Sequence, residues 1–495
     1  MIFQPRRSLI KEISIFFLVL ILAMFGCTDV KENKSAKIDS LISAYNNCGR
    51  FHGTVLVAEN GKIILEKGYG IASREWDMPH EPDTKFRIAS ITKPFVALLV
   101  MQLVEKGKID LDGKLTDYLS FYRRDTGEKV TIHHLLSHSS GIPDYLRIPG
   151  FWQNQLLLQY SRKNFVNQFC SSDLEFKPGL KYQYNNSGYY LLGLVIEEVT
   201  GKSFETVLRE NILKALGMNN TGLTNDRSVF KKKAIGYVKS GFDFYNVPYY
   251  NVENSYTSGQ MFSTVRDLYL FDQALYTDLL LSAEYRKKLF TPYFHYTKRN
   301  FFIGYDWELG KLPLTDDTDS VSYVQHMGGS NGFNTLFCRF PDNKHLIVLL
   351  GNLDSAPLIE IRGEITSVLY DKPYDMPLKS IAWEMRKIIE EEGITSAIKF
   401  YHSRKAQHSD EYDLGVGELN TVGYYLLRKS RINEAITIFK LNVEIYPDYA
   451  NGWDSLAEAC MVKGDISSAI TYYQKCLELN PGSQNAVNML KKLNE

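Results

Sequence analysis

The sequence predicts an α+β domain followed by an all-α repeat domain. Strand-like runs stand at both ends of a long region of helical patterns, at residues 53–72 and 334–350. This order indicates an antiparallel sheet flanked by helices, with a helical subdomain inserted between its strands. Near the C-terminus similar residues return after a spacing of 34, which is typical of stacked helix pairs.

The chain begins with features of an exported protein. Basic residues precede an apolar run over residues 13–25, and Gly26-Cys27 follows. The run is short for a membrane span and predicts a signal peptide at 1–27, with a polar linker at 28–40. Its end resembles a bacterial lipoprotein cleavage site, so we expect lipidation of Cys27 and attachment to a membrane of the bacterial cell envelope. Ordinary signal cleavage and an uncleaved anchor helix are the alternatives.

The first part of the α+β domain contains a hairpin and a buried helix. Residues 54–57 and 63–65 flank the Asn-Gly pair at 60–61, which favours a tight hairpin turn. The apolar run 95–104 predicts a buried helix that ends near Gly107.

The later elements follow from apolar periodicity and turn residues. We expect an irregular stretch at 243–256 and a closing helix at 359–370, which ends the domain of residues 41–371. The remaining expected elements are helices at 189–199, 204–216 and 265–276, and strands at 334–340 and 346–350.

Composition excludes several classes of function. Lys plus Arg and Asp plus Glu both number 57, and no basic cluster with interleaved aromatics is present, so nothing points to nucleic acid. The six cysteines lack Cys-x-x-Cys spacing, which implies neither a disulfide framework nor a zinc site. The mechanism that the motifs below imply needs no metal and no organic cofactor.

Residues 413–495 show an internal repeat with a period of 34. Small and apolar residues of the first copy recur in the second, which is the tetratricopeptide helix-turn-helix pattern, with a capping helix at 481–493. A plain helical bundle is the alternative, and residues 372–412 are expected to form a helical connector. The matching pairs are Leu419/Trp453, Gly423/Ala457, Leu427/Met461, Ile432/Ile466, Ala435/Ala469, Ile436/Ile470, Phe439/Tyr473 and Pro447/Pro481.

A serine and a lysine, Ser90 and Lys93, stand three residues apart where the buried helix begins. Residues three apart on a helix share a face, so the Lys93 amine can approach the Ser90 hydroxyl. A lysine with a pKa lowered by burial can deprotonate such a serine. The alternative is N-capping by Ser90 and a solvated Lys93.

Three motifs resemble the serine β-lactamase and penicillin-binding-protein superfamily, on its class C and D-alanyl-D-alanine-carboxypeptidase-like side. They are Ser90-x-x-Lys93, Tyr184-x-Asn186 and His326-x-Gly328, in that order along the chain. The resemblance implies a β-lactamase/transpeptidase-like fold for residues 41–371.

The resemblance also implies roles for these residues. Ser90 is the expected nucleophile, Lys93 helps to deprotonate it, and Tyr184 relays protons once nearby cations such as Lys93 lower its pKa. The alternatives without a catalytic role are that Tyr184 only packs, that Asn186 is a helix N-cap, that His326 is a strand histidine satisfied by its neighbours, and that His138 is structural. The resemblance further implies binding roles. Asn186 hydrogen-bonds the substrate amide, and His326 lies on an edge strand that faces the cleft. The backbone N–H groups of Ser90 and Gly329 form the oxyanion hole, and Gly328 and Gly329 let the substrate approach the strand closely.

The predicted function is a serine hydrolase that forms an acyl-enzyme on an ester or amide, including D-amino-acid peptides or other cell-envelope substrates. His326 stands where antibiotic-directed relatives carry a lysine, and a histidine is mostly neutral at pH 7, which suits esterase, amidase or D-peptidase members. The alternative is a non-catalytic envelope scaffold that binds a protein or peptide through its repeats. With an active enzyme, the same repeats are expected to recruit a protein partner.

Overall fold

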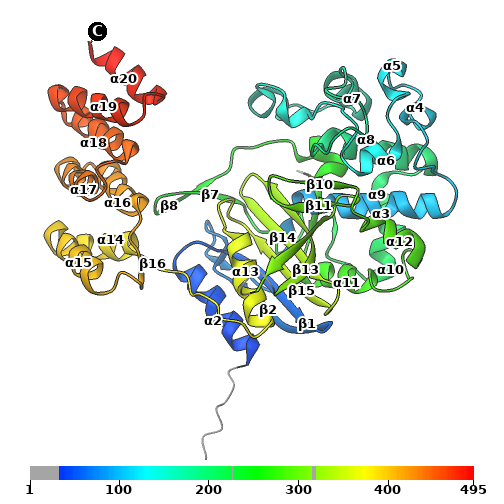
Figure 1. Ribbon diagram of the computed structural model, residues 1–495, viewed down its shortest axis with the longest axis horizontal. Coiled ribbons are helices and arrows are strands. Elements are labelled where there is room, and N and C mark those ends of the chain that lie inside the picture. Colours follow the sequence, from blue (N-terminus) through cyan, green and yellow to red (C-terminus); the bar gives the residue numbers. More distant parts are fainter. Residues whose placement is uncertain (1–32, 226, 315–318, 495) are drawn as a thin grey trace, which may run out of the picture.

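A computed structural model describes residues 33–225, 227–314 and 319–494. The predicted signal peptide at 1–27, with the lipidation site Cys27, lies outside the described residues. Within the described residues no helix is long and apolar enough to cross a membrane. Figure 1 shows an α+β body and a separate stack of helices that ends at the C-terminus.

The α+β body is built on an eight-stranded antiparallel sheet, with strand order β10-β11-β12-β13-β14-β15-β1-β2. Pairing of β1 with β15 joins the two ends of the domain, which confirms the prediction. The Asn60-Gly61 turn has φ values of 50° and 75°, as a tight hairpin requires. The strands are β1 Gly53–Glu59, β2 Lys62–Tyr69, β10 Phe294–Tyr296, β11 Phe301–Ile303, β12 Glu308–Pro313, β13 Ser320–Ser330, β14 Phe333–Phe340 and β15 His345–Gly351.

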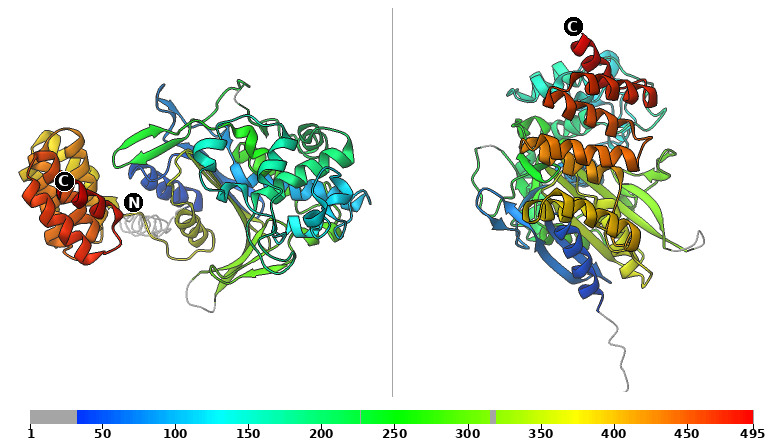
Figure 2. Two further views of the ribbon diagram at one scale, coloured as in Figure 1. Left: turned by 90° about the horizontal axis from the view of Figure 1, so that it is seen from above. Right: turned by 90° about the vertical axis from the view of Figure 1, so that its left-hand side faces the viewer.

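Helices cover both faces of the sheet. α2 (Lys34–Asn47) and α13 (Leu358–Leu369) pack on one face. The larger helical region, which contains α3 (Thr92–Glu105) and α8 (Asn186–Thr200), packs on the other (Figures 1 and 2). Alternate residues of β1 point into the two cores, Val55 and Val57 toward α2 and α13, and Leu56 toward α3. The linker prediction for 28–40 is wrong from residue 34 onward, because those residues begin α2 and bury Ile38.

α3 is the central helix of the helical region. It spans Thr92–Glu105 and is followed by Gly107 at a φ of 65°, which confirms the predicted end of the helix. The other elements of this region are α4 Leu115–Tyr118, α5 Arg124–Gly127, α6 Ile132–Leu136, η2 Tyr145–Arg147, η3 Phe151–Gln155, α7 Arg162–Phe169, α8 Asn186–Thr200, α9 Phe204–Leu208, η4 Arg209–Leu213, α10 Lys214–Leu216, α11 Val265–Ala274 and α12 Ala283–Leu289. The short strands are β3 Ile71–Ser73, β4 Met78–Pro79, β5 Phe86–Arg87, β6 Gly222–Leu223 and β9 Met261–Ser263.

The stretch predicted as irregular at 243–256 contains regular structure. Asp243–Asn246 forms β8, which pairs with β7 (Tyr237–Ser240), and Val252–Ser258 forms the 3₁₀ segment η5. The many tyrosines and asparagines of this stretch concealed a short hairpin with Gly241 at its turn, where φ is 61°.

The repeat region consists of helix pairs stacked in chain order (Figure 2). The two predicted repeats are α16 Val416–Arg428 with α17 Ile432–Ile445, and α18 Ala450–Lys463 with α19 Ile466–Leu479; α20 Gln484–Asn494 is the capping helix. These helices agree with the 34-residue period of the sequence.

The connector predicted at 372–412 is instead part of the helical stack. α14 (Ile381–Glu391) and α15 (Ile394–Gln407) pack as a pair and share one core with α16 and α17. Ala397 of α15 precedes Ala435 of α17 by 38 residues, because the loop after α15 is four residues longer than the loop after α17. This insertion hid the additional pair from the periodicity of the sequence.

The β7–β8 hairpin of the α+β body docks onto this stack. Phe242 at its turn is buried, with ring centroids 5.2 Å from Trp383 and 5.5 Å from Tyr425. Beside it, Arg428 lies 3.1 Å from Asp243. The hairpin therefore makes a hydrophobic anchor with a polar rim between the two parts of the chain.

We predict that Phe242→Ala lowers the free energy of unfolding of the repeat region by about 3 kcal/mol, because a buried aromatic side chain is removed from a core. The measurement is urea unfolding followed by tryptophan fluorescence, since Trp383 lies in this core. The matched control is Tyr245→Ala on the same hairpin, where the side chain is 48% exposed and the loss should be small. Equal losses in the two variants would contradict the docking role of Phe242.

Candidate active site

Ser90 lies in a 3₁₀ turn, Ala89–Ile91, directly before α3, rather than at the N-cap of that helix. The turn is held against the sheet because Thr335 Oγ1 of β14 donates to the Ile88 carbonyl at 3.2 Å. Ala89 has a φ of 46°, a left-handed conformation that costs about 1 kcal/mol for a non-glycine residue. The fold therefore fixes the serine on a strained turn directly before α3.

Lys93 is fully buried in the first turn of α3. Its Nζ lies 3.1 Å from Ser90 Oγ and 2.7 Å from the carbonyl oxygen of Ser258 in η5. Burial lowers the pKa of Lys93 to about 8, and the charges of Asp306 and Asp144 only partly oppose this shift. Since a carbonyl oxygen can only accept, the amine donates one N–H to Ser258, and in its neutral form it can turn its lone pair toward Ser90.

Tyr184 lies beside the same two residues. Its ring centroid is 4.8 Å from Lys93 Nζ, and its hydroxyl shares a hydrogen bond with the Ser90 side chain. Burial raises the pKa of Tyr184 well above its ordinary value. The expectation that Lys93 would lower this pKa is therefore wrong, because desolvation of the phenolate outweighs any favourable charge. Tyr184 is a phenol at neutral pH and can donate a proton.

Asn186 is the first residue of α8, two residues after Tyr184, and it is not the N-cap of that helix. That position belongs to Asn185, whose Oδ1 accepts from the backbone N–H of Gly188 at 2.6 Å. Asn186 Nδ2 donates to Asp144 Oδ2 at 3.0 Å, and burial raises the pKa of Asp144. The Asn186 amide is thus oriented by a buried carboxyl group that the motif did not reveal.

His326 contacts protein groups through both ring nitrogens. Its Nδ1 lies 2.7 Å from the carbonyl oxygen of Met327, and its Nε2 lies 2.9 Å from Asp306 Oδ2. The second contact lacks hydrogen-bond alignment, since Asp306 Oδ2 receives no aligned donor among the described residues. His326 thus lies on β13 beside the cleft, with both ring nitrogens close to protein oxygens.

Asp306 joins His326 to His138. His138 Nε2 lies 2.6 Å from Asp306 Oδ1, while His138 Nδ1 accepts from the backbone N–H of Asn185 at 3.1 Å. Burial would raise the pKa of Asp306, but His326 and His138 hold it at about 2; burial also lowers the pKa of His138. This buried His138–Asp306–His326 network links the Tyr184–Asn186 segment, through the Asn185 backbone, to the strand of His326, and such contacts agree with a structural role for His138.

The strand of His326 and the two glycines is not the edge of the sheet, because β13 lies between β12 and β14. Its pairing with β12 ends at Gln325, however, so residues 326–330 form a local edge. A Cβ at Gly329 would meet open space, as the predicted close approach of a substrate requires. A Cβ at Gly328 would lie 2.1 Å from the Ile88 carbonyl oxygen, so that glycine serves the packing of the Ser90 turn.

The structure brings Ser90, Lys93 and Tyr184 together. Nothing in the sequence indicated Asp306, Asp144 or the carbonyl of Ser258. Each of these lies far along the chain from the residue that it contacts, outside the three motifs. Asp306 has a φ of 61°, a turn conformation that Asp tolerates, so Gly304-Tyr-Asp-Trp307 signals a turn and nothing more.

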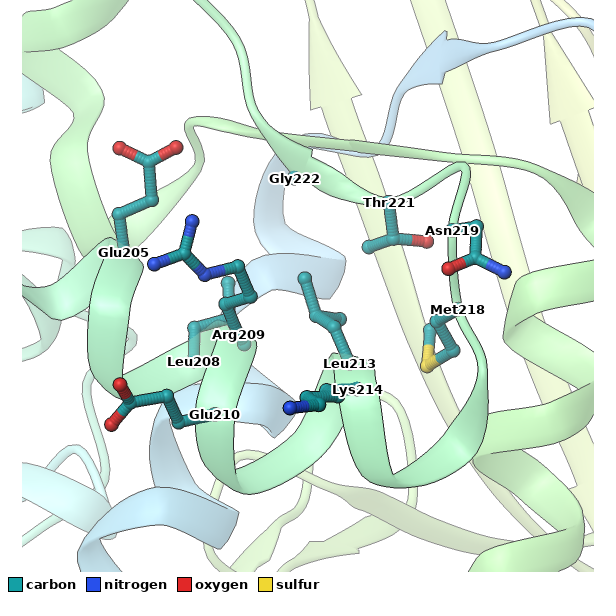
Figure 3. A pocket seen from close by; sticks show the side chains of 10 residues that line it. All are labelled: Glu205, Leu208, Arg209, Glu210, Leu213, Lys214, Met218, Asn219, Thr221 and Gly222. Atoms are coloured by element: carbon teal, nitrogen blue, oxygen red, sulfur yellow. The ribbon is translucent and has the colours of Figure 1, made fainter.

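A cleft of about 740 Å³ opens beside Tyr184, Asp306 and His326. A second pocket of about 550 Å³ lies against α9 and α10, and it contains none of the predicted site residues (Figure 3). The cleft beside the motifs is therefore the candidate substrate-binding cleft next to Ser90 and Lys93.

Comparison with known proteins agrees with this arrangement. The family model described as Beta-lactamase matches residues 38–365, and a tetratricopeptide repeat model matches residues 450–483. Penicillin-binding protein 4* of Bacillus subtilis is 29% identical over 365 residues, covering 70% of this chain and 79% of the relative.

Two solved structures are also similar. A penicillin-binding protein from Bacillus halodurans is 27% identical with a TM-score of 0.56, covering 67% of this chain and 97% of the other. A D-stereospecific amidohydrolase from Streptomyces sp. is 25% identical with a TM-score of 0.56, covering 68% and 98%.

We predict that Asp306→Ala lowers the free energy of unfolding at pH 7 by about 3 kcal/mol, because two buried imidazoles lose their shared carboxylate. Chemical denaturation measures the loss. Asp173→Ala is the control, since the Asp173 side chain is 91% exposed and its ion pair with Arg123 should contribute little. A loss for Asp306→Ala no larger than for the control would mean that the network does not stabilise the fold.

Proposed function

Since the chain belongs to the beta-lactamase family, we propose that it is a serine hydrolase that forms an acyl-enzyme at Ser90 on ester or amide substrates. The observation that carries the proposal is the buried Lys93 amine, 3.1 Å from Ser90 Oγ with a pKa of about 8. At pH 7 about a tenth of such an amine is neutral, whereas an exposed lysine is almost entirely charged.

In the first step, the neutral Lys93 amine accepts the proton of the Ser90 hydroxyl while Ser90 Oγ attacks the carbonyl carbon of the substrate. The negative charge that develops on the substrate oxygen is stabilised by the backbone N–H groups of Ser90 and Gly329. One such donor lowers a barrier by about 3 kcal/mol in comparable sites. Gly329 suits this role because no side chain stands between its backbone and the open cleft.

In the second step, the tetrahedral intermediate collapses and expels the alcohol or amine. Tyr184 donates its phenolic proton to this leaving group and recovers a proton from Lys93, which lies against its ring. Water then attacks the acyl-enzyme, and the proton it loses returns through Tyr184 and Lys93 to Ser90 as the acid departs. Asn186, oriented by Asp144, donates or accepts a hydrogen bond to the substrate amide.

The substrate class follows from the site and its relatives. Amides or esters of D-amino acids fit because a similar solved structure is described as a D-stereospecific amidohydrolase. His326 supplies no permanent cation and both its ring nitrogens have protein partners, which favours esterase, amidase or D-peptidase activity over dedicated β-lactam hydrolysis.

Because similar relatives are penicillin-binding proteins by name, we also propose that the enzyme lies in the bacterial cell envelope, held there through Cys27.

The repeats add a second role to the proposal. Tetratricopeptide pairs present a curved helical surface, and we propose that this surface recruits a protein or peptide partner while the α+β domain works as an enzyme. A purely non-catalytic scaffold is not favoured, because Ser90, Lys93 and Tyr184 retain contacts suited to acyl transfer.

We predict that a fluorophosphonate probe labels the wild-type protein and does not label Ser90→Ala, since only a deprotonated, positioned serine attacks the phosphorus atom. Labelling is read by intact-protein mass spectrometry as one adduct for each chain. Ser320→Ala, an exposed serine at the far end of β13, is the matched control and should label like the wild type. Equal labelling of Ser90→Ala and wild type would remove Ser90 from the mechanism.

A further inference from the structure

We propose that the cleft beside the catalytic serine binds an acidic part of the substrate, one that carries carboxylate or phosphate groups. This inference deepens the proposed hydrolase activity and rests on it. The cleft shares Tyr184 and His326 with the active site, so a substrate acylating Ser90 can extend into it. Four cationic side chains also line the cleft: Arg147, Lys181, Lys298 and Arg299.

These cations come from three segments that are distant in the sequence. Arg147 ends the short η2 turn, and Lys181 lies in the loop that precedes α8. Lys298 and Arg299 form the turn between β10 and β11, at the end of the main sheet (Figure 1). The loop and the turn meet through the rings of Tyr182 and Tyr296, whose centroids are 5.6 Å apart. The fold thus gathers positive charge around one opening.

The protein itself does not neutralise this charge. Among the described residues, Arg147, Lys181, Lys298 and Arg299 make no ion pair, and all four are exposed. Lys181 Nζ lies over the face of Phe176, 4.6 Å from the ring centroid. The chain as a whole has equal numbers of acidic and basic residues, so an uncompensated group of four cations is a local feature.

The two carboxylates that line the same cleft have contacts with other protein groups. Asp306 is buried between its two histidines, and Glu308 Oε1 accepts hydrogen bonds from Tyr323 and Gln325, both at 2.8 Å. No ion pair joins either carboxylate to the four cations among the described residues, and four cations against two carboxylates leave the lining with a net positive charge. A concave site lined by charge of one sign attracts ligands of the opposite sign and raises their local concentration.

The second pocket gives an internal comparison. Its two cations, Arg209 and Lys214, stand among Glu205 and Glu210, which line the same pocket (Figure 3). Charge there is balanced, as on most of a neutral protein. The second pocket thus lacks the excess of cations found in the cleft that adjoins the catalytic residues, and it can serve as a control site.

The kinetic test uses three 4-nitrophenyl esters that differ only in their terminal group: monomethyl glutarate, glutarate and 4-phosphonobutyrate. The double variant Lys298→Gln/Arg299→Gln is compared with Arg209→Gln/Lys214→Gln, which removes the same charge from the second pocket. We expect the ratio of kcat/KM for each acidic ester to that for the neutral ester to fall about fivefold in the first variant. The control should keep the wild-type ratios, and salt should reduce the difference.

A loss confined to the carboxylate or to the phosphonate identifies the group that is recognised. Unchanged ratios for both acidic esters, or equal losses in the two variants, would overturn the proposal. Failure of the proposed hydrolase activity is distinguishable, because it would abolish turnover of all three esters.

If none of the esters is turned over, a binding measurement still tests the acidic subsite. Titration calorimetry with Ser90→Ala, which cannot acylate, uses penta-glutamate, inorganic tetraphosphate and neutral penta-glutamine as probes. We expect at least one acidic probe to bind at 50 mM salt and weaken at 200 mM, as phosphate and carboxylate contacts with lysine and arginine do. Adding Lys298→Gln/Arg299→Gln to the Ser90→Ala protein should weaken binding of the acidic probe about fivefold. Binding that is the same for acidic and neutral probes would contradict an acidic subsite.

Discussion

The amine of Lys93, buried between Ser90 Oγ and the Ser258 carbonyl, is the interaction on which the active site depends. An ammonium group without water is costly, so the protein must either pair the charge or shift the pKa. Here the nearest carboxyl groups are too weakly coupled to offset burial, and the pKa of Lys93 falls to about 8. The same burial keeps Tyr184 protonated. The same exclusion of water therefore provides both a base, Lys93, and an acid, Tyr184.

Ser258 lies in η5, which follows the hairpin that contacts the repeat stack. η5 is fixed against α8, where Thr257 Oγ1 donates to the Tyr189 carbonyl at 2.7 Å, and the Ser258 hydroxyl lies 2.8 Å from that of Tyr145. The β7–β8 hairpin, with Phe242 in the core of the repeat stack, precedes η5 by a few residues. The chain thus passes directly from the surface of the repeats to the carbonyl that orients Lys93.

Much of this could be predicted from the sequence because it is local. The hairpin at Asn60-Gly61, the apolar run of α3 and the spacing of Ser90 and Lys93 are encoded within a few residues. The repeats were visible because their period is constant, and α14 with α15 was missed because a longer loop shifts that period.

The missed parts of the site are products of tertiary structure. Asp306 meets His138 across 168 residues of sequence, and Lys93 meets Ser258 across 165. Periodicity contains no information about such pairs. The pKa of Tyr184 was misjudged for a related reason: the sequence shows which charges are near in the motif, but not how little water surrounds the phenol.

The most direct test of this account is the pKa of Lys93 itself. Protein labelled with ¹³C at the lysine Cε is titrated by NMR, and the Lys93 resonance is assigned by its absence from Lys93→Arg. The account predicts a midpoint near pH 8, well below the other lysines, for an amine that is partly neutral when it meets a substrate. A midpoint near the ordinary lysine value, about 10.4, would show that burial does not prepare Lys93 as a base.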